Sequence, residues 1–229
     1  MLRDVFTVIL TFALFSPAAA DQELVPLSTE IPEEVLIGTP PDILVLLFPY
    51  LEKPREAGDL PELMVPPGTV NVARDKPVTS SDTRPLIGEL SFITNGDKRG
   101  SEESYVELAP MLQWVQIDLE SRCEIHVVWV WHYFREARSY HDVIVQVSDD
   151  PEFTEGVQTI YNNDQDNSAG QGIGRDRPYI ETNLGHPIEA GGVAGRYVRL
   201  YSNGNTANDL NHYVEVEVFG RPQAAGDQD

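Results

Sequence analysis

The sequence predicts an all-β protein, built mainly as a two-sheet sandwich of about eight antiparallel strands. From Asn71 onward, apolar and polar residues alternate with a period of two in short stretches, which is typical of half-buried strands. Loops rich in Asp, Asn, Gly and Ser separate these stretches. No amphipathic stretch of ten or more residues predicts a major helix.

The composition is strongly acidic. Asp and Glu number 37 against 16 Lys and Arg, for a formal net charge of −21 in 229 residues. Proteins that bind nucleic acid, and proteins that bind acidic membranes through polybasic segments, use Lys and Arg to neutralise phosphate. Neither class is therefore favoured, and we expect no nucleic-acid partner.

The length and composition suit a folded protein. With 41% apolar residues the chain is long enough for one sizeable domain with appendages. Cys123 is the only cysteine, so no internal disulfide is possible.

Residues 1–20 have the features of a secretory signal peptide. Arg3 stands near the start, the apolar stretch 5–15 is short for a membrane span, and the small residues 18–20 form a cleavage site. A retained membrane anchor is the alternative. We expect cleavage after Ala20 and export to the periplasm, the cell surface or the extracellular space, with no membrane span in the mature chain.

Residues 21–68 form a Pro- and Glu-rich extended arm or linker, because their prolines block a long helix or a central strand. Within the arm lies one apolar run, 43–48. We favour an arm whose apolar side chains lie on the following domain; the alternative is that 43–48 docks a protein partner. We expect the arm to add little core, so that a chain starting near Gly68 folds alone.

The sandwich domain is expected over 69–221, followed by a disordered tail, 222–229. Its clearest alternation places valines 214, 216 and 218 on the inner face and Tyr213, Glu215 and Glu217 on the outer face. The predicted strands are 114–119, 124–132, 143–147, 157–161, 196–202 and 213–218.

Several motifs resemble a known family. They are NVARDKPVTSSD (71–82), ITNGDK (93–98), WVQIDL (114–119), GRYVRLYS (195–202) and NHYVEVEVFG (211–220). In this order they resemble a discoidin, or coagulation factor 5/8 C-type, domain of the galactose-binding-like superfamily. The resemblance implies a jelly-roll β-sandwich that usually binds glycans, and in some members lipid headgroups or proteins. The terminal cysteine pair of animal members is missing, so the chain looks like the bacterial carbohydrate-binding branch.

Strand parity, the alternating direction of successive strands, predicts where a ligand binds. If successive strands are antiparallel, the loops 133–139, 162–178 and 203–211 meet at one end of the sandwich. Loops on a rigid sandwich commonly carry binding residues. These loops are rich in the planar donors and acceptors that recognise neutral sugars, with aromatic residues for the apolar side of a ring.

The candidate ligand-binding residues are His132, Tyr133, Arg135, Arg138, Asn163, Asp164, Asp166, Asn203, Asn205, Asn211 and His212. We expect Arg138 and His212 to share adjacent hydroxyls of one sugar, with Tyr133 or Phe134 as the apolar platform. The alternative is that the Asn and Asp residues cap turns and the arginines pair with acidic neighbours.

Calcium is the cofactor that the resemblance implies. The family's calcium commonly bridges a DG turn to a glutamate of the closing strand, and these positions are Asn95, Asp97 and Glu215 here. The alternative is a plain Asn-Gly turn. Asp164, Asp166 and Ser168 have the spacing of half an EF-hand loop without the rest of the motif, so we expect them to organise the loop or contact a ligand.

The leading functional prediction is an exported, non-catalytic carbohydrate-binding module with a glycan or polysaccharide as its ligand. The alternative is a cell-surface adhesion or structural protein that docks a protein partner through its acidic arm. An enzyme is not predicted, because the sequence contains neither HExxH nor a nucleophile-elbow motif.

Overall fold

The computed structural model describes residues 23–223, except 39, 57, 59 and 102. The predicted signal peptide and residues 224–229 of the predicted tail lie outside the described residues. The predicted all-β sandwich is confirmed. Its strands are β3 (Val70–Asn71), β4 (Val78–Ser80), β5 (Val106–Leu108), β6 (Gln113–His132), β7 (Ile144–Ser148), β8 (Gln158–Asn162), β9 (His186–Ser202) and β10 (Asn211–Pro222).

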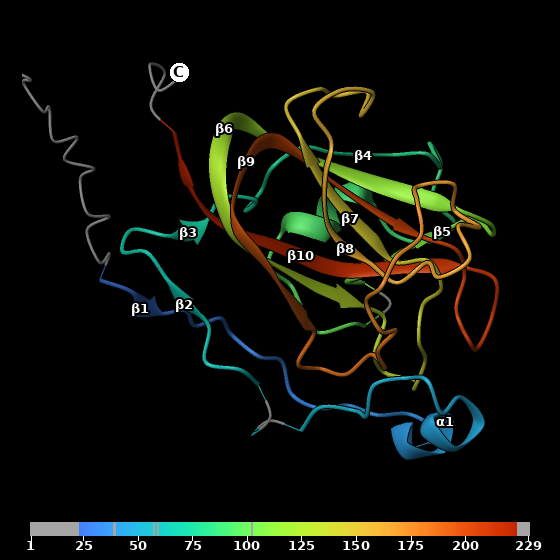
Figure 1. Ribbon diagram of the computed structural model, residues 1–229. Coiled ribbons are helices and arrows are strands. Elements are labelled where there is room, and N and C mark those ends of the chain that lie inside the picture. Colours follow the sequence, from blue (N-terminus) through green and yellow to red (C-terminus); the bar gives the residue numbers. More distant parts are fainter. Residues whose placement is uncertain (1–22, 39, 57, 59, 102, 224–229) are drawn as a thin grey trace, which may run out of the picture.

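Two long bent strands, β6 and β9, build the sandwich (Figure 1). They pair antiparallel over most of their length, with register shifts between Asp118 and Cys123 and between Ile125 and Val127. Glu120 has a left-handed φ of 63°, and its N–H donates to Asp118 Oδ1 over 2.8 Å, which shapes the bend. The predicted strands 114–119 and 124–132 are therefore the two halves of one strand that passes from one sheet into the other.

The bend explains the arrangement of the other strands. The sheet order is β3-β10-β6-β9-β7-β8, with β4 paired to β6 and β5 paired to β10. β4 pairs with the first half of β6, whereas β10 pairs mainly with its second half. The inner faces of both halves supply the main core, which includes Val115, Ile117, Val130 and Val216. This layering keeps the apolar face of each strand out of water.

The three predicted loops meet at one end, as strand parity predicts. Tyr140 and Asn205 form an isolated β-bridge, and the His141 N–H donates to the Gly204 carbonyl over 3.0 Å. The Glu181 N–H donates to the Arg138 carbonyl over 2.9 Å. Backbone hydrogen bonds therefore hold the loops after β6, β8 and β9 against one another.

The arm lies along one side of the sandwich, and the expectation that it adds little core is wrong (Figure 1). Its strands β1 (Val25–Pro26) and β2 (Met64–Val65) pair antiparallel. Leu63 and Val65 are buried in a second cluster with Trp129 and Trp131, on the outer face of β6. Because prolines prevent a long helix, most of the arm is extended and its side chains can follow the sheet surface.

Coverage by the arm also corrects the predicted outer face of the closing strand. Glu217 of β10 is 6% exposed and forms an ion pair of 2.8 Å with Lys98. Thr29 of the arm donates to Glu217 over 2.6 Å and accepts from Lys98 Nζ over 2.6 Å. Lys98 Nζ also lies 4.5 Å from the centroid of the Trp131 ring. The buried pair is tolerable because hydrogen bonds replace its lost hydration.

The apolar run 43–48 forms most of a short helix, α1 (Pro41–Leu47), which has no buried residue. Leu46 is 82% exposed and Leu47 66%. This part of the arm therefore adds no core. The 3₁₀ helix η2 (Leu90–Thr94) instead packs against β10. Over the described part of the chain, no helix has the length and apolarity needed to cross a membrane.

Candidate functional site

Three predicted residues, Tyr133, Arg138 and His212, line a small polar pocket of about 180 Å³ at the loop end. We call it the Arg138–His212 pocket. β5 contributes Glu107, and the start of β10 contributes His212. The other lining residues come from the loops before β5, after β6 and after β9, and the complete set is Tyr105, Glu107, Tyr133, Glu136, Arg138, Asn208 and His212.

His212 is held by hydrogen bonds at both ring nitrogens. Nε2 lies 3.1 Å from Glu107 Oε2, and Nδ1 lies 2.9 Å from the Tyr140 hydroxyl oxygen. An ionised carboxylate only accepts, so Nε2 carries the proton and Nδ1 accepts from Tyr140. Burial, and to a lesser degree the charge of Arg138, lower the pKa of His212 to about 3. The imidazole is therefore neutral and fixed in one tautomer.

Arg138 lies over the ring of Tyr133, with 4.7 Å between its guanidinium carbon and the ring centroid. Its side chain is only 3% exposed, and it donates to Glu136 Oε2 over 2.5 Å. A guanidinium has further N–H donors in the same plane. Arg138 can therefore bind a ligand oxygen at the pocket while Tyr133 and Glu136 hold its orientation.

The pocket combines donors and acceptors at short range. Glu107 uses Oε2 for His212, and a carboxylate has a second oxygen that can accept from a ligand hydroxyl. Burial raises the pKa of Glu107, and the charge of Arg138 opposes this rise. A donor fork beside a carboxylate matches adjacent hydroxyls of a sugar, each of which both donates and accepts. The rings of Tyr133 and Tyr105, whose centroids are 5.0 Å apart, pack edge to face beside the pocket and help to hold Arg138.

The structure separates the predicted residues into different pockets. Asn163, Asp166 and Asn203 line a larger pocket of about 620 Å³ at the same end, together with Tyr50 of the arm. We call it the Tyr50 pocket. Asp142, Asp164 and Asp166 in and beside its wall bring carboxylate oxygens within 4.8 Å of one another and could hold a metal ion.

Four predicted residues are buried and line neither loop-end pocket: His132, Asp164 and Asn211 are 0% exposed and Asn205 is 6% exposed. His132 Nδ1 lies 2.7 Å from Glu181 Oε1. Asp164 Oδ2 accepts from the Ala169 N–H over 2.9 Å, and Asn211 Oδ1 accepts from the Gly204 N–H over 2.8 Å. These side chains hold the loops in shape, so they drop out of the candidate ligand-binding set.

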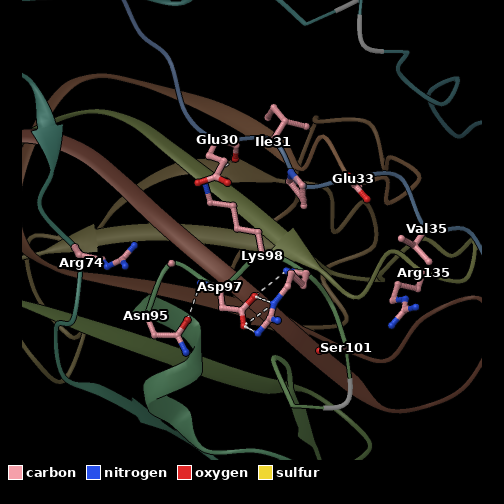
Figure 2. A pocket seen from close by; sticks show the side chains of 13 residues that line it. Glu30, Ile31, Glu33, Val35, Arg74, Asn95, Asp97, Lys98, Ser101 and Arg135 are labelled. Atoms are coloured by element: carbon pink, nitrogen blue, oxygen red, sulfur yellow. Dashed lines mark hydrogen bonds and ion pairs between the residues drawn. The ribbon is translucent and has the colours of Figure 1, made fainter.

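Arg135 lies elsewhere, in a pocket of about 770 Å³ between the arm and the loop 95–101 (Figure 2). Figure 2 shows the Lys98 side chain extending toward Glu30 of the arm, and Arg74 lying on the same side of the pocket as Asn95. The predicted calcium ligands Asn95 and Asp97 line this pocket.

The predicted calcium ligands differ in how well they fit a cation. Glu215 is 0% exposed, its Oε2 accepts from the Gly96 N–H over 2.8 Å, and its Oε1 has no hydrogen-bond partner among the described residues. An orphaned carboxylate oxygen suits a calcium ion. The Asp97 carboxylate instead binds Arg99, and Asn95 Oδ1 accepts from the Asp97 N–H over 2.7 Å. Only Glu215 therefore presents an unsatisfied oxygen.

Sequence reasoning misses Glu107, Asn208 and Tyr50. Glu107 belongs to a strand of only three residues, which leaves no readable alternation. Asn208 lies in the predicted loop 203–211, but nothing in its residue type separates it from its neighbours. Tyr50 belongs to the arm, whose position on the loop end has no local signal.

No protein-family model matches the sequence, and no curated protein matches it. Solved structures do match. One is a serum fucolectin of striped bass, Morone saxatilis, with a TM-score of 0.50, 18% identity, and coverage of 70% of this chain and 52% of that one. This chain therefore spans about half the length of the fucolectin.

Two carbohydrate-binding modules are also similar. The family 32 module of AlyQ, solved with 4,5-unsaturated mannuronic acid, has a TM-score of 0.46 and 16% identity over 64% of this chain and 96% of that one. A fucose-binding module of Streptococcus pneumoniae has a TM-score of 0.46 and 18% identity over 65% and 96%. The fold that this chain shares with the fucolectin is a β-sandwich, in agreement with the fold that the sequence motifs predict.

Proposed function

We propose that this protein is an exported, non-catalytic module that binds a glycan in the Arg138–His212 pocket. The observation that carries the proposal is the convergence of a guanidinium, a carboxylate and an imidazole on one small polar pocket. Two structural neighbours are named for sugar binding, a fucolectin and a fucose-binding module, and this agrees with the proposed function. The two groups suited to acid–base chemistry, His212 and Glu107, are bonded to each other and act as positioning and binding groups.

The charges of the pocket narrow the ligand class. Glu107 and Glu136 outnumber the single arginine, so a polyanionic glycan would meet net repulsion. A neutral sugar can use Arg138 as donor and Glu107 as acceptor. Export rests on the predicted signal peptide, and it would place the module in the periplasm, at the cell surface or outside the cell, where polysaccharides are accessible.

A glycan array with the mature chain and its Arg138→Ala variant tests the proposal. We expect specific hits whose affinity falls about tenfold to a hundredfold in the variant, the usual range for a lost hydrogen bond to a charged group. Arg175→Ala, an exposed loop arginine that lines neither loop-end pocket, is the matched control and keeps the hits.

Arg138 is buried, so its removal also costs stability. Arg138→Lys keeps the charge without the planar fork and serves as the second variant. A folded Arg138→Lys variant with unchanged glycan affinity would place the site elsewhere.

A second candidate function is protein docking through the arm. The exposed apolar residues Ile43, Leu46 and Leu47 of α1 favour it, because such side chains gain from being covered. The same array separates the two functions. A complete absence of glycan hits for the mature chain, together with capture of a defined protein that is lost on mutation of Leu46 and Leu47, would favour docking.

We also propose that calcium binds at Glu215, with Asn95 beside it. Calcium is expected to raise the melting temperature, since a site occupied at a hundredfold excess over its dissociation constant adds roughly 2.7 kcal/mol. Glu215→Gln should remove this shift, whereas Asp142→Asn should remove it if the aspartates of the Tyr50 pocket bind the ion instead. Identical melting curves in chelator and in millimolar calcium would rule out both sites.

A further inference from the structure

The arm takes part in a second pocket at the loop end. Its Tyr50 ring is 50% exposed and lines the Tyr50 pocket opposite residues of the sandwich loops. Phe48 contacts Tyr50 edge to face, with 6.1 Å between the ring centroids. An exposed aromatic side chain beside a polar cavity is the arrangement that receives the apolar face of a sugar ring.

The arm is fixed where it carries Tyr50. Leu51, the next residue, is 3% exposed. Arg177 Nη2 donates to the Tyr50 and Leu51 carbonyls over 3.2 and 3.3 Å, and the Glu52 N–H donates to the Pro178 carbonyl over 2.9 Å. Tyr50 is therefore held in place before any ligand arrives, which lowers the entropy cost of binding.

The opposite wall is polar and carries negative charge. Asn203 Nδ2 donates to Asp142 Oδ2 over 2.8 Å, and the Ser168 hydroxyl donates to the same oxygen over 2.9 Å. Asp166 is exposed, and its Oδ1 accepts from the Ser168 N–H over 3.0 Å. The lining contains Asp142, Asp166 and His141 but neither Lys nor Arg, and the guanidinium of the neighbouring Arg177 is engaged by the Tyr50 and Leu51 carbonyls. Such a pocket attracts a cation and repels a uronate.

We infer that the Tyr50 pocket is a second carbohydrate subsite, completed by the arm, which prefers a sugar with a free amino group. Tyr50 supplies the stacking face, Asp166 and Asp142 the charge for the ammonium group, and Asn203 an amide for a hydroxyl. The inference rests on the proposed glycan binding and adds to it a different pocket and a ligand class that the Arg138–His212 pocket does not select.

Calorimetric titration of the mature chain in chelator, with tetramers of glucosamine, N-acetylglucosamine and galacturonate, tests the inference. We expect the glucosamine tetramer to bind most tightly and the galacturonate tetramer to bind least. Tyr50→Ala should weaken glucosamine binding about tenfold, while Tyr50→Phe, which keeps the ring, should not. Asp166→Asn should abolish the preference for glucosamine over its N-acetylated form. Leu46→Ala, an exposed change on the same arm outside the pocket, is the control.

Unchanged affinity in Tyr50→Ala, or galacturonate binding as tight as glucosamine binding, would overturn the inference. Arg138→Ala separates its failure from failure of the proposed function. Loss of binding only in Arg138→Ala leaves the proposed function standing without the second subsite. Loss only in Tyr50→Ala supports the second subsite and shows that the Arg138–His212 pocket is not a glycan site.

Discussion

A chain that begins at Thr69 is expected to lose most of its stability. It lacks Leu51, Leu63 and Val65, whose exposed fractions are 3%, 5% and 3%. Burial of each such side chain contributes about 1.5–3 kcal/mol, and a whole domain has a free energy of unfolding of only about 5–15 kcal/mol. The truncation also uncovers Trp129 and Trp131, and removes the Thr29 hydroxyl that bridges the buried Lys98–Glu217 pair.

Urea unfolding of the mature and truncated chains measures this loss through the midpoint and the free energy of unfolding. Leu63→Ala in the full-length mature chain provides a folded variant, and we expect a cost of about 2–5 kcal/mol. Leu47→Ala, which is 66% exposed on the same arm, is the matched control and should change stability little. Equal midpoints for the truncated and mature chains would show that the arm lies on the sandwich without stabilising it.

Stability in chelator is expected to fall as the pH rises from about 4.5 to about 8, because of Glu215. Burial, and to a lesser degree Glu217, raise the pKa of Glu215 from its ordinary 4.5 to about 8 in the folded protein. In this window the unfolded chain ionises while the folded chain holds the proton. This stabilisation is complete below 4.5 and declines by up to about 1.4 kcal/mol per pH unit until the folded carboxyl also ionises.

Urea unfolding at several pH values, for the mature chain and Glu215→Gln, checks this expectation. The amide cannot ionise, so the variant should lack this part of the decline with pH. Glu120→Gln is the control, because the Glu120 side chain is 57% exposed. Its stability should change with pH in the same way as that of the mature chain. Calcium binds the ionised carboxylate, so its stabilisation should be larger near pH 9 than near pH 6. The same pH slope in the mature chain and Glu215→Gln would mean that Glu215 is ionised in the folded state.

Part of the candidate site follows from strand order alone. Tyr133 and Arg138 come after β6, and His212 opens β10, so antiparallel pairing brings them to one end. Residue type cannot separate ligand-binding from loop-holding side chains, because Asn, Asp and His serve both purposes. His132 and His212 are both buried histidines, yet His132 pairs with Glu181 inside the loops while His212 lines a pocket.

The sandwich could be predicted from the sequence alone, because a period of two is a local property of each strand and the motifs keep their order along the chain. What covers the outer face of the sheet could not be predicted in this way. The arm's position over Trp129 and Trp131 depends on contacts between residues far apart in the chain, such as Thr29 and Glu217. The arm's position turns an outward glutamate into a buried one, and the hydrogen bonds from Arg177 hold Tyr50 at the loop end. Solvation and pKa depend on such neighbours, and local alternation carries no record of them.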